Sequence, residues 1–376
     1  MVIIQEVKTN KQIKQFVNFP LELYKDTPYF VPPLYNDEIK VLKRKSPYET
    51  VCESIFFLAY IDNKVVGRIQ GIIQKQYNEI KNERRIRFSR FDAINNQEVA
   101  NKLFEAVENW AKSKNMDTVC GPLGFSDFER EGLLIEGFDQ DSTFEEQYNF
   151  DYYQKLIENC GYQKEVDWVE SRIFPPENAK QQIEKLKRLT DLTLKRAKVH
   201  LADTSISDRK YIDLYKDAFF DVIEEGYKEI YGVVPFTPKQ RKLIIDSYRP
   251  VIKSKYLFVL LDESNKAVGI GLVFPSFSDA LRYSKGKLYP KTLFKFLKAI
   301  NHPTVVDLGL VAVLPEYRNS GITSALMLKM MEFLADGKIK YFETNLNLED
   351  NLAVRTQWNR FNSIENKKRR SFIKKL

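Results

Sequence analysis

The chain has 376 residues, of which 43% are hydrophobic and 29% charged, as in a globular protein with room for two domains. Three widely spaced cysteines and two histidines argue against a disulfide framework and leave little material for a metal site. The net charge of +8 leaves nucleic acid, an anionic membrane surface and phosphate-rich small molecules open as partners. The first residues lack a signal-peptide pattern, and no segment approaches the roughly 18 apolar residues that cross a membrane, so we expect a cytoplasmic protein.

In chain order, the sequence predicts the same succession of elements twice. Residues 10–23 and 208–229 are predicted as amphipathic helices, and each precedes a β-hairpin, at 56–73 and 256–274. The first hairpin is followed by strand, helix, strand, helix and strand, at 86–92, 98–112, 118–120, 152–159 and 166–173. The second hairpin is followed by the same order, at 304–313, 323–334, 341–345, 352–361 and 369–373. The repetition predicts two copies of an α+β unit, each a mixed central sheet flanked by helices.

Two adjacent prolines, Pro175 and Pro176, interrupt the chain between the copies. Residues 177–197 then show a helical pattern rich in basic side chains. We therefore predict a first domain over residues 1–175, a basic helical linker over 176–200 and a second domain over 201–376.

Residues 308–326 carry the clearest chemical signal. An apolar strand ends at Pro315, a short loop with Arg318 and Gly321 follows, and an apolar-periodic helix comes next. The first turn of a helix has unpaired N–H groups that favour an anion, and an arginine adds fixed positive charge. The order Val-x-Pro-x-Tyr-Arg-x-x-Gly-Ile before a helix resembles the acyl-CoA signature of the GNAT acyltransferase superfamily. The repeated α+β unit is similar to the GNAT core, so the resemblance covers most of the chain.

The resemblance implies acyl-CoA or acetyl-CoA as cosubstrate, without a metal. The predicted cofactor-binding residues lie on the strand, the loop and two following helices, and are Leu310, Val311, Val313, Arg318, Asn319, Ser320, Gly321, Ile322, Thr323 and Asn351. Thr323 departs from the family pattern, which has glycine or alanine there. Its side chain would either crowd the diphosphate or contact it through the hydroxyl.

Many GNAT members use an acidic residue on the strand before the loop to deprotonate the amine. Asp307 is the carboxylate in the apolar run 305–314, and Glu343 on the next predicted strand is the alternate candidate. A capping or ion-pairing role for Asp307 is the competing interpretation. Trp358 stands where many relatives have a tyrosine near the sulfur, and an indole is a poor general acid.

The first copy lacks the Arg-x-x-Gly loop and has Asp92 and Glu98 in its place, so we expect it to be a degenerate GNAT-like domain without coenzyme. It contains a segment at 121–139 rich in glycine, carboxylate and aromatic residues, which favours either a functional loop or a set of turns. This segment resembles one in tandem-GNAT bacterial proteins that include bacterial ceramide synthases.

An insertion at 275–303 interleaves lysines with aromatic and aliphatic residues at a helical spacing. This pattern suits either a membrane surface and a long acyl chain or a packed helix with a solvated lysine face.

Together these features predict an N-acyltransferase that moves an acyl group from acyl-CoA to a primary amine. A long-chain lipid amine such as a sphingoid base, reached at the inner membrane surface, is the finer prediction. The alternatives are an acetyltransferase for small molecules or proteins and a non-catalytic acyl-CoA-binding protein. Nucleic acid as a partner would rest on charge alone, without an aromatic-basic motif, and we do not expect it.

Overall fold

The computed structural model describes residues 1–376, apart from the side chain of Ala353. Within the described chain, the strands form one mixed sheet with the order β1-β2-β3-β4-β5-β14-β7-β12-β11-β10-β9-β8, to which β6 and β13 attach at β14 and β7. The strands are β1 (Ile3–Glu6), β2 (Cys52–Ile61), β3 (Lys64–Gln74), β4 (Arg85–Ala93), β5 (Thr118–Gly121), β6 (Leu133–Glu136), β7 (Gln163–Phe174), β8 (Val199–Leu201), β9 (Leu257–Asp262), β10 (Ala267–Pro275), β11 (Val305–Val313), β12 (Tyr341–Glu343), β13 (Asn347–Leu348) and β14 (Asn362–Lys375).

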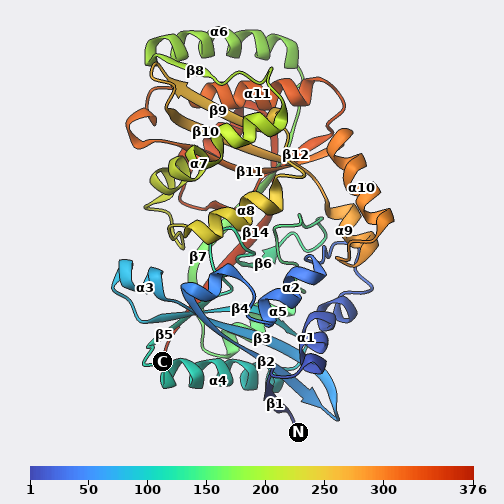
Figure 1. Cartoon of the computed structure of the whole chain (residues 1–376). Helices are drawn as coiled ribbons and strands as arrows, with labels where there is room; N and C mark the ends of the chain where they lie inside the picture. Colours follow the sequence, from blue (N-terminus) through green and yellow to red (C-terminus); the bar gives the residue numbers. More distant parts are fainter.

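Helices flank this sheet in both halves, as predicted (Figure 1). They are α1 (Asn10–Leu23), α2 (Tyr35–Leu42), α3 (Lys75–Lys81), α4 (Gln97–Ser113), α5 (Tyr152–Asn159), α6 (Ala179–Ala197), α7 (Asp208–Tyr227), α8 (Pro238–Tyr248), α9 (Ser278–Ser284), α10 (Pro290–Asn301), α11 (Thr323–Ala335) and α12 (Leu352–Arg355). The predicted α+β fold with a mixed sheet is confirmed. No helix among the described residues is both long and apolar enough to span a bilayer.

The two halves exchange their last strands. β14, from the end of the chain, pairs antiparallel with β5 of the first half, whereas β7 of the first half pairs with β12 of the second. β7 and β14 also pair with each other, which joins the strands of the two halves into one sheet. The exchange brings the C-terminus into the same half as the N-terminus (Figure 1). The sequence predicted both strands but not their exchange, and the division at residue 175 stays a prediction.

A buried ion cluster lies at this junction. The Nζ atom of Lys367, on β14, is 2.7 Å from Glu146, 2.7 Å from Glu170 on β7 and 3.2 Å from Glu343 on β12. Three carboxylates meet three cations here, because Arg369 pairs with Glu146 and Glu170 and Arg172 pairs with Glu343. A buried charge is tolerated where opposite charges and hydrogen bonds surround it, and these ion pairs link β14, β7 and β12 across the junction.

The segment predicted as a linker forms α6, which packs on α11 through buried Leu186 and Thr190. The predicted insertion forms α9 and α10. Thr237 begins α8 with a capping box to Gln240, a helix start that sequence analysis did not single out.

Candidate active site

The strands β11 and β12 run side by side for a short distance and then diverge. Their parallel pairing extends from Val305↔Tyr341 to Asp307↔Glu343. β11 continues to Val313, whereas the chain after β12 follows β7, where the Thr344 N–H donates to the Ser171 carbonyl at 2.9 Å. The divergence leaves one edge of β11 facing a cavity instead of a neighbouring strand.

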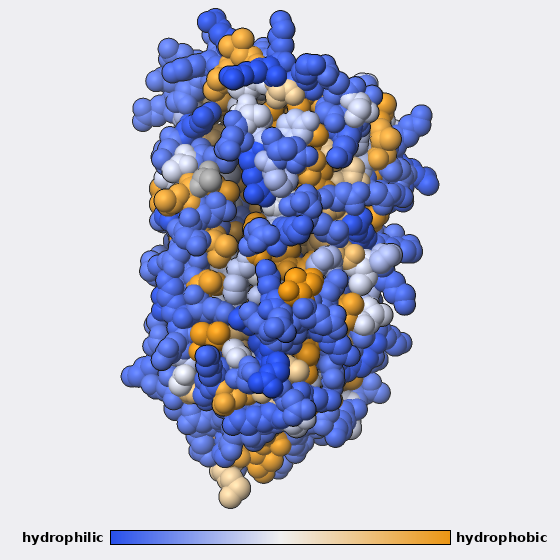
Figure 2. Space-filling view, turned by 90° about the vertical axis from the view of Figure 1, so that its left-hand side faces the viewer, coloured by the Kyte–Doolittle hydropathy of each residue, from blue (hydrophilic) through white to orange (hydrophobic). Residues whose placement is uncertain are grey.

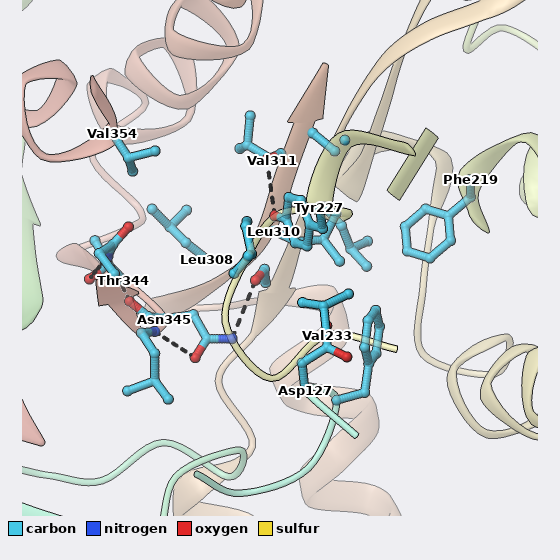
Figure 3. A pocket seen from close by; sticks show the side chains of 18 of the residues that line it. Asp127, Phe219, Tyr227, Val233, Leu308, Leu310, Val311, Thr344, Asn345 and Val354 are labelled. Atoms are coloured by element: carbon cyan, nitrogen blue, oxygen red, sulfur yellow. Dashed lines mark hydrogen bonds between the residues drawn. The ribbon is translucent and has the colours of Figure 1, made fainter. Parts of the chain in front are cut away.

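Backbone groups of β11 point into this opening. The Tyr227 hydroxyl donates to the Val311 carbonyl at 3.0 Å, and the Asn345 amide donates to the Gly309 carbonyl at 3.3 Å (Figure 3). In a strand, the N–H and C=O of one residue face the same edge. The Val311 N–H therefore faces the opening too, and Val313, two residues further, follows the same alternation.

A loop and a helix start close one end of the opening. Gly321 has φ of 81°, and a Cβ at this position would lie 3.0 Å from Thr193 of α6, so the loop requires glycine here. The Arg318 guanidinium donates to the Gly226 carbonyl at 2.8 Å, which ties the loop to the end of α7. α11 then begins at Thr323, and the positive end of its helix dipole faces the loop. The Ser324 and Ala325 N–H groups donate to the Gly321 and Ile322 carbonyls, each at 3.0 Å.

A cavity of about 820 Å³ occupies this opening and extends between the two halves. This volume is near the upper end of the roughly 300–1,000 Å³ typical of small-molecule sites. In Figure 2, apolar atoms gather at the middle of a mostly hydrophilic face, between the halves. Seven predicted cofactor residues line the cavity: Leu310, Val311, Val313, Arg318, Asn319, Thr323 and Asn351.

The other three predicted cofactor residues shape the loop. The Ser320 hydroxyl donates to the Tyr317 carbonyl at 2.6 Å, Gly321 supplies the turn, and Ile322 is buried in the core below α11.

The cavity has an apolar part under α7 and α8. Its walls are aliphatic and aromatic side chains from α7, α8, the segment after α8 and strands β9 to β11: Ile212, Phe219, Phe220, Ile244, Ile245, Ile252, Leu257, Leu272, Phe274 and Leu308. Such a surface is suited to a hydrocarbon chain and offers little to a polar acyl group.

The two predicted catalytic carboxylates lie side by side but outside the cavity lining. Glu343 belongs to the buried ion cluster. Asp307 is buried, and neither of its carboxyl oxygens has a hydrogen-bond partner among the described residues. Burial, followed by the charges of Glu146, Glu343 and Glu145, raises the pKa of Asp307 well above its usual range. Its catalytic assignment stays a prediction.

Asn351 and Trp358 also line the cavity. The Asn351 side chain caps α12 by accepting the Val354 N–H at 3.3 Å, as expected for an asparagine that opens this helix. Trp358 is buried, and its indole N–H has no partner among the groups that the structure describes.

Comparison with known proteins agrees with this geometry. Residues 213–355 match the model of the acetyltransferase (GNAT) family. This match identifies a GNAT domain in the second half of the chain. It is 26% identical over 390 residues to Protein YghO of Escherichia coli, covering 100% of this chain and 95% of that protein. It is 24% identical over 290 residues to the bacterial ceramide synthase of Caulobacter vibrioides, covering 76% of this chain and 72% of that protein.

Solved structures show a similar fold over the whole chain, and one of them is a tandem GNAT protein. A tandem GNAT protein from the clavulanic acid biosynthesis pathway superposes with a TM-score of 0.57 at 11% identity, covering 100% of this chain and 98% of that one. A GCN5-related N-acetyltransferase from Sphaerobacter thermophilus gives 0.53 at 13% identity, covering 100% and 95%. These likenesses concern the fold, and they confirm the predicted tandem GNAT architecture.

The first GNAT-like half differs at the equivalent opening. β4 and β5 also pair in parallel for three residues, from Arg85↔Thr118 to Arg87↔Cys120. Beyond them, the Leu123 N–H donates to the Phe88 carbonyl at 2.9 Å, so the 121–125 backbone occupies the gap. Asp92, which the sequence argument placed at the mouth, is buried and paired with Arg68 at 2.7 Å. The chain itself therefore fills part of the space that is open in the second half, and a smaller cavity of about 180 Å³ remains beside Ser89, Arg90 and Asp92.

The cavity also contains carboxylates that sequence analysis did not assign a role. Asp127, Glu131 and Glu145 come from the first half and line the cavity of the second. Burial raises the pKa of Asp127 to about 6, of Glu131 to about 8 and of Glu145 to about 7. The unusual composition of residues 121–139 was the available signal, but it did not indicate which half these side chains face.

Proposed function

We propose that this GNAT protein transfers an acyl group from acyl-CoA to a primary amine. The observation that supports it is the open edge of β11, with a helix N-terminus at one end and an apolar cavity at the other. A thioester bound along this edge would have polar groups for its pantetheine, positive charge for its diphosphate and an apolar wall for its acyl chain.

Each part of the donor has a proposed partner. The N–H groups of Val311 and Val313 bind the pantetheine amides, because they face the cavity edge. The first turn of α11, with Arg318 and Asn319, binds the diphosphate. Thr323 lies at the cavity surface, so we propose that its hydroxyl contacts a phosphate oxygen.

We further propose that the acyl chain is long. Each methylene that leaves water for the apolar cavity contributes at most about 0.8 kcal/mol, which is close to a fourfold gain in affinity. Affinity should therefore rise steeply from acetyl-CoA through octanoyl-CoA to palmitoyl-CoA. The bacterial ceramide synthase among the relatives supports a lipid amine as acceptor.

The surface of α10 supports contact with a membrane. Large apolar side chains of this insertion are exposed, with Phe294 at 70%, Leu297 at 56% and Leu293 at 50%. Lysines lie among them, namely Lys285, Lys287, Lys291, Lys295 and Lys298. Exposed apolar residues beside cations are the composition of a helix that lies on an anionic lipid surface. We propose that this helix brings the protein to a membrane-held acceptor.

One comparison tests the proposal against its rivals. The protein is incubated with palmitoyl-CoA or acetyl-CoA, and with sphinganine or a soluble amine such as glucosamine, and N-acyl products are measured by mass spectrometry. Palmitoyl transfer to sphinganine should be fastest. Faster acetyl transfer to glucosamine would favour a small-molecule acetyltransferase. Tight acyl-CoA binding with neither product would indicate a non-catalytic binding protein.

A further inference from the structure

Glu131 is an unusual side chain in the cavity wall. It is 6% exposed, it lines the cavity, and its Oε1 atom has no hydrogen-bond partner in the described part of the chain. The next residue, Gly132, has φ of 72°, and a Cβ there would lie 2.8 Å from the Cβ of Arg369. This tight turn fixes the direction in which the chain presents Glu131.

Arg87 is a cation whose charge acts on Glu131, and it is already engaged elsewhere. The Arg87 guanidinium donates to the Gly124 carbonyl at 3.1 Å and to the Gly232 carbonyl at 2.9 Å. These bonds tie the 121–139 segment of the first half to the loop after α7 of the second. Burial and the charge of neighbouring Asp127 raise the pKa of Glu131 to about 8, although Arg87 acts in the opposite direction.

A buried carboxylate without a partner is costly, and such groups concentrate where a ligand supplies the missing charge. An acyl-CoA offers an anionic diphosphate, neutral amides and a neutral thioester, none of which carries the positive charge that would neutralise a carboxylate. The positive ammonium group of an acceptor amine would. Asp127 lies on the same first-half segment, and Figure 3 shows it among the residues that line the cavity.

We propose that Glu131, with Asp127 beside it, is the amine subsite of the acyltransfer site. The first half thereby contributes side chains that complete the active site of the second half. Glu131 binds the ammonium group and accepts one proton from it, leaving a neutral amine and a carboxylic acid. The amine then forms the C–N bond to the thioester carbon, the C–S bond breaks, and the remaining excess proton of the nitrogen goes to the thiolate. This assignment rests on the proposed acyltransferase function.

The test uses two acceptors that differ in their need for a base. Sphinganine is protonated at neutral pH, whereas a long-chain O-alkylhydroxylamine is already neutral. With palmitoyl-CoA as donor, Glu131→Gln should lower kcat/KM for sphinganine about a hundredfold or more. It should change kcat/KM for the hydroxylamine only a few-fold, and leave palmitoyl-CoA affinity in calorimetry unchanged. Asp127→Asn should show the same selectivity with a smaller loss.

Glu136→Gln is the matched control, because Glu136 is exposed on β6 of the same segment, and it should behave as the wild type. An equal loss for both acceptors, or full activity of Glu131→Gln with sphinganine, would overturn the amine subsite while leaving the acyltransferase function in place. A wild-type protein that acylates neither acceptor would overturn the proposed function itself.

Discussion

Replacing Lys367 with methionine should destabilise the protein strongly, because Lys367 is the centre of the junction between the halves. Its Nζ atom contacts three buried carboxylates at 2.7, 2.7 and 3.2 Å. The substitution keeps most of the apolar stem and removes the charge, so three carboxylates remain for two cations. Removing one partner of a buried ion pair costs about 3–5 kcal/mol. Guanidinium unfolding followed by circular dichroism would measure the loss.

The loss should also depend on pH. Burial alone raises the pKa of Glu146, but Lys367 and Arg369 lower it below its usual range. Without Lys367, a carboxylate in the cluster binds a proton more tightly in the native than in the unfolded chain. Stability then falls as pH rises above the unfolded value of about 4.3, so the deficit should be larger near pH 8 than near pH 5.

Lys368→Met provides the control. Lys368 is the next residue on β14, is partly exposed and pairs with Asp167 at 3.3 Å. This substitution should cost at most about 1 kcal/mol. If Lys367→Met were as mild as Lys368→Met at both pH values, the buried cluster would not hold the exchanged strands in register.

Four further outcomes follow from the same geometry. Arg318→Ala should weaken CoA binding by about 1.5–3 kcal/mol in calorimetry, and unchanged affinity would remove Arg318 from the diphosphate site. Asp307→Asn should lower turnover much less than Glu131→Gln if Glu131 is the base. A larger loss of turnover in a folded Asp307→Asn variant would favour Asp307 as the catalytic base. Residues 201–376 expressed alone should aggregate, because β12 would lack its neighbour β7. Co-expression with residues 1–200 should restore a folded complex, which size-exclusion chromatography would detect. A folded, monomeric 201–376 fragment would contradict the strand exchange. Phe294→Ser should reduce the fraction of protein that co-sediments with anionic vesicles at low salt. If this fraction changed neither with salt nor with the substitution, α10 would not be the membrane contact.

Local patterns were enough to predict the strand, loop and helix of the proposed coenzyme site. Val313, Arg318 and Thr323 lie within a short stretch whose periodicity and glycine position specify their geometry directly. The family model over residues 213–355 agrees with that reading. Local patterns also predicted most of the helices and strands, because each element has its own hydrophobic periodicity and end signals.

Long-range choices could not be read from the sequence. β7 and β14 have similar strand patterns, and nothing local states which half each completes. Glu131 is one of several carboxylates in its segment, and its position in the cavity depends on the docking of the halves. For Asp307, sequence analysis recognised the cost of burial, but the register shift of β10 and β11 at Leu272/Val273, opposite Gly309, interrupts the alternation needed to place its side chain.

Titration of the intact protein with palmitoyl-CoA by isothermal calorimetry tests the central claim most directly. The open edge of β11 and the filled gap beside β4 predict one site per chain, which Arg318→Ala weakens. Two equivalent sites, or one site unaffected by Arg318→Ala, would contradict a coenzyme site in the second half.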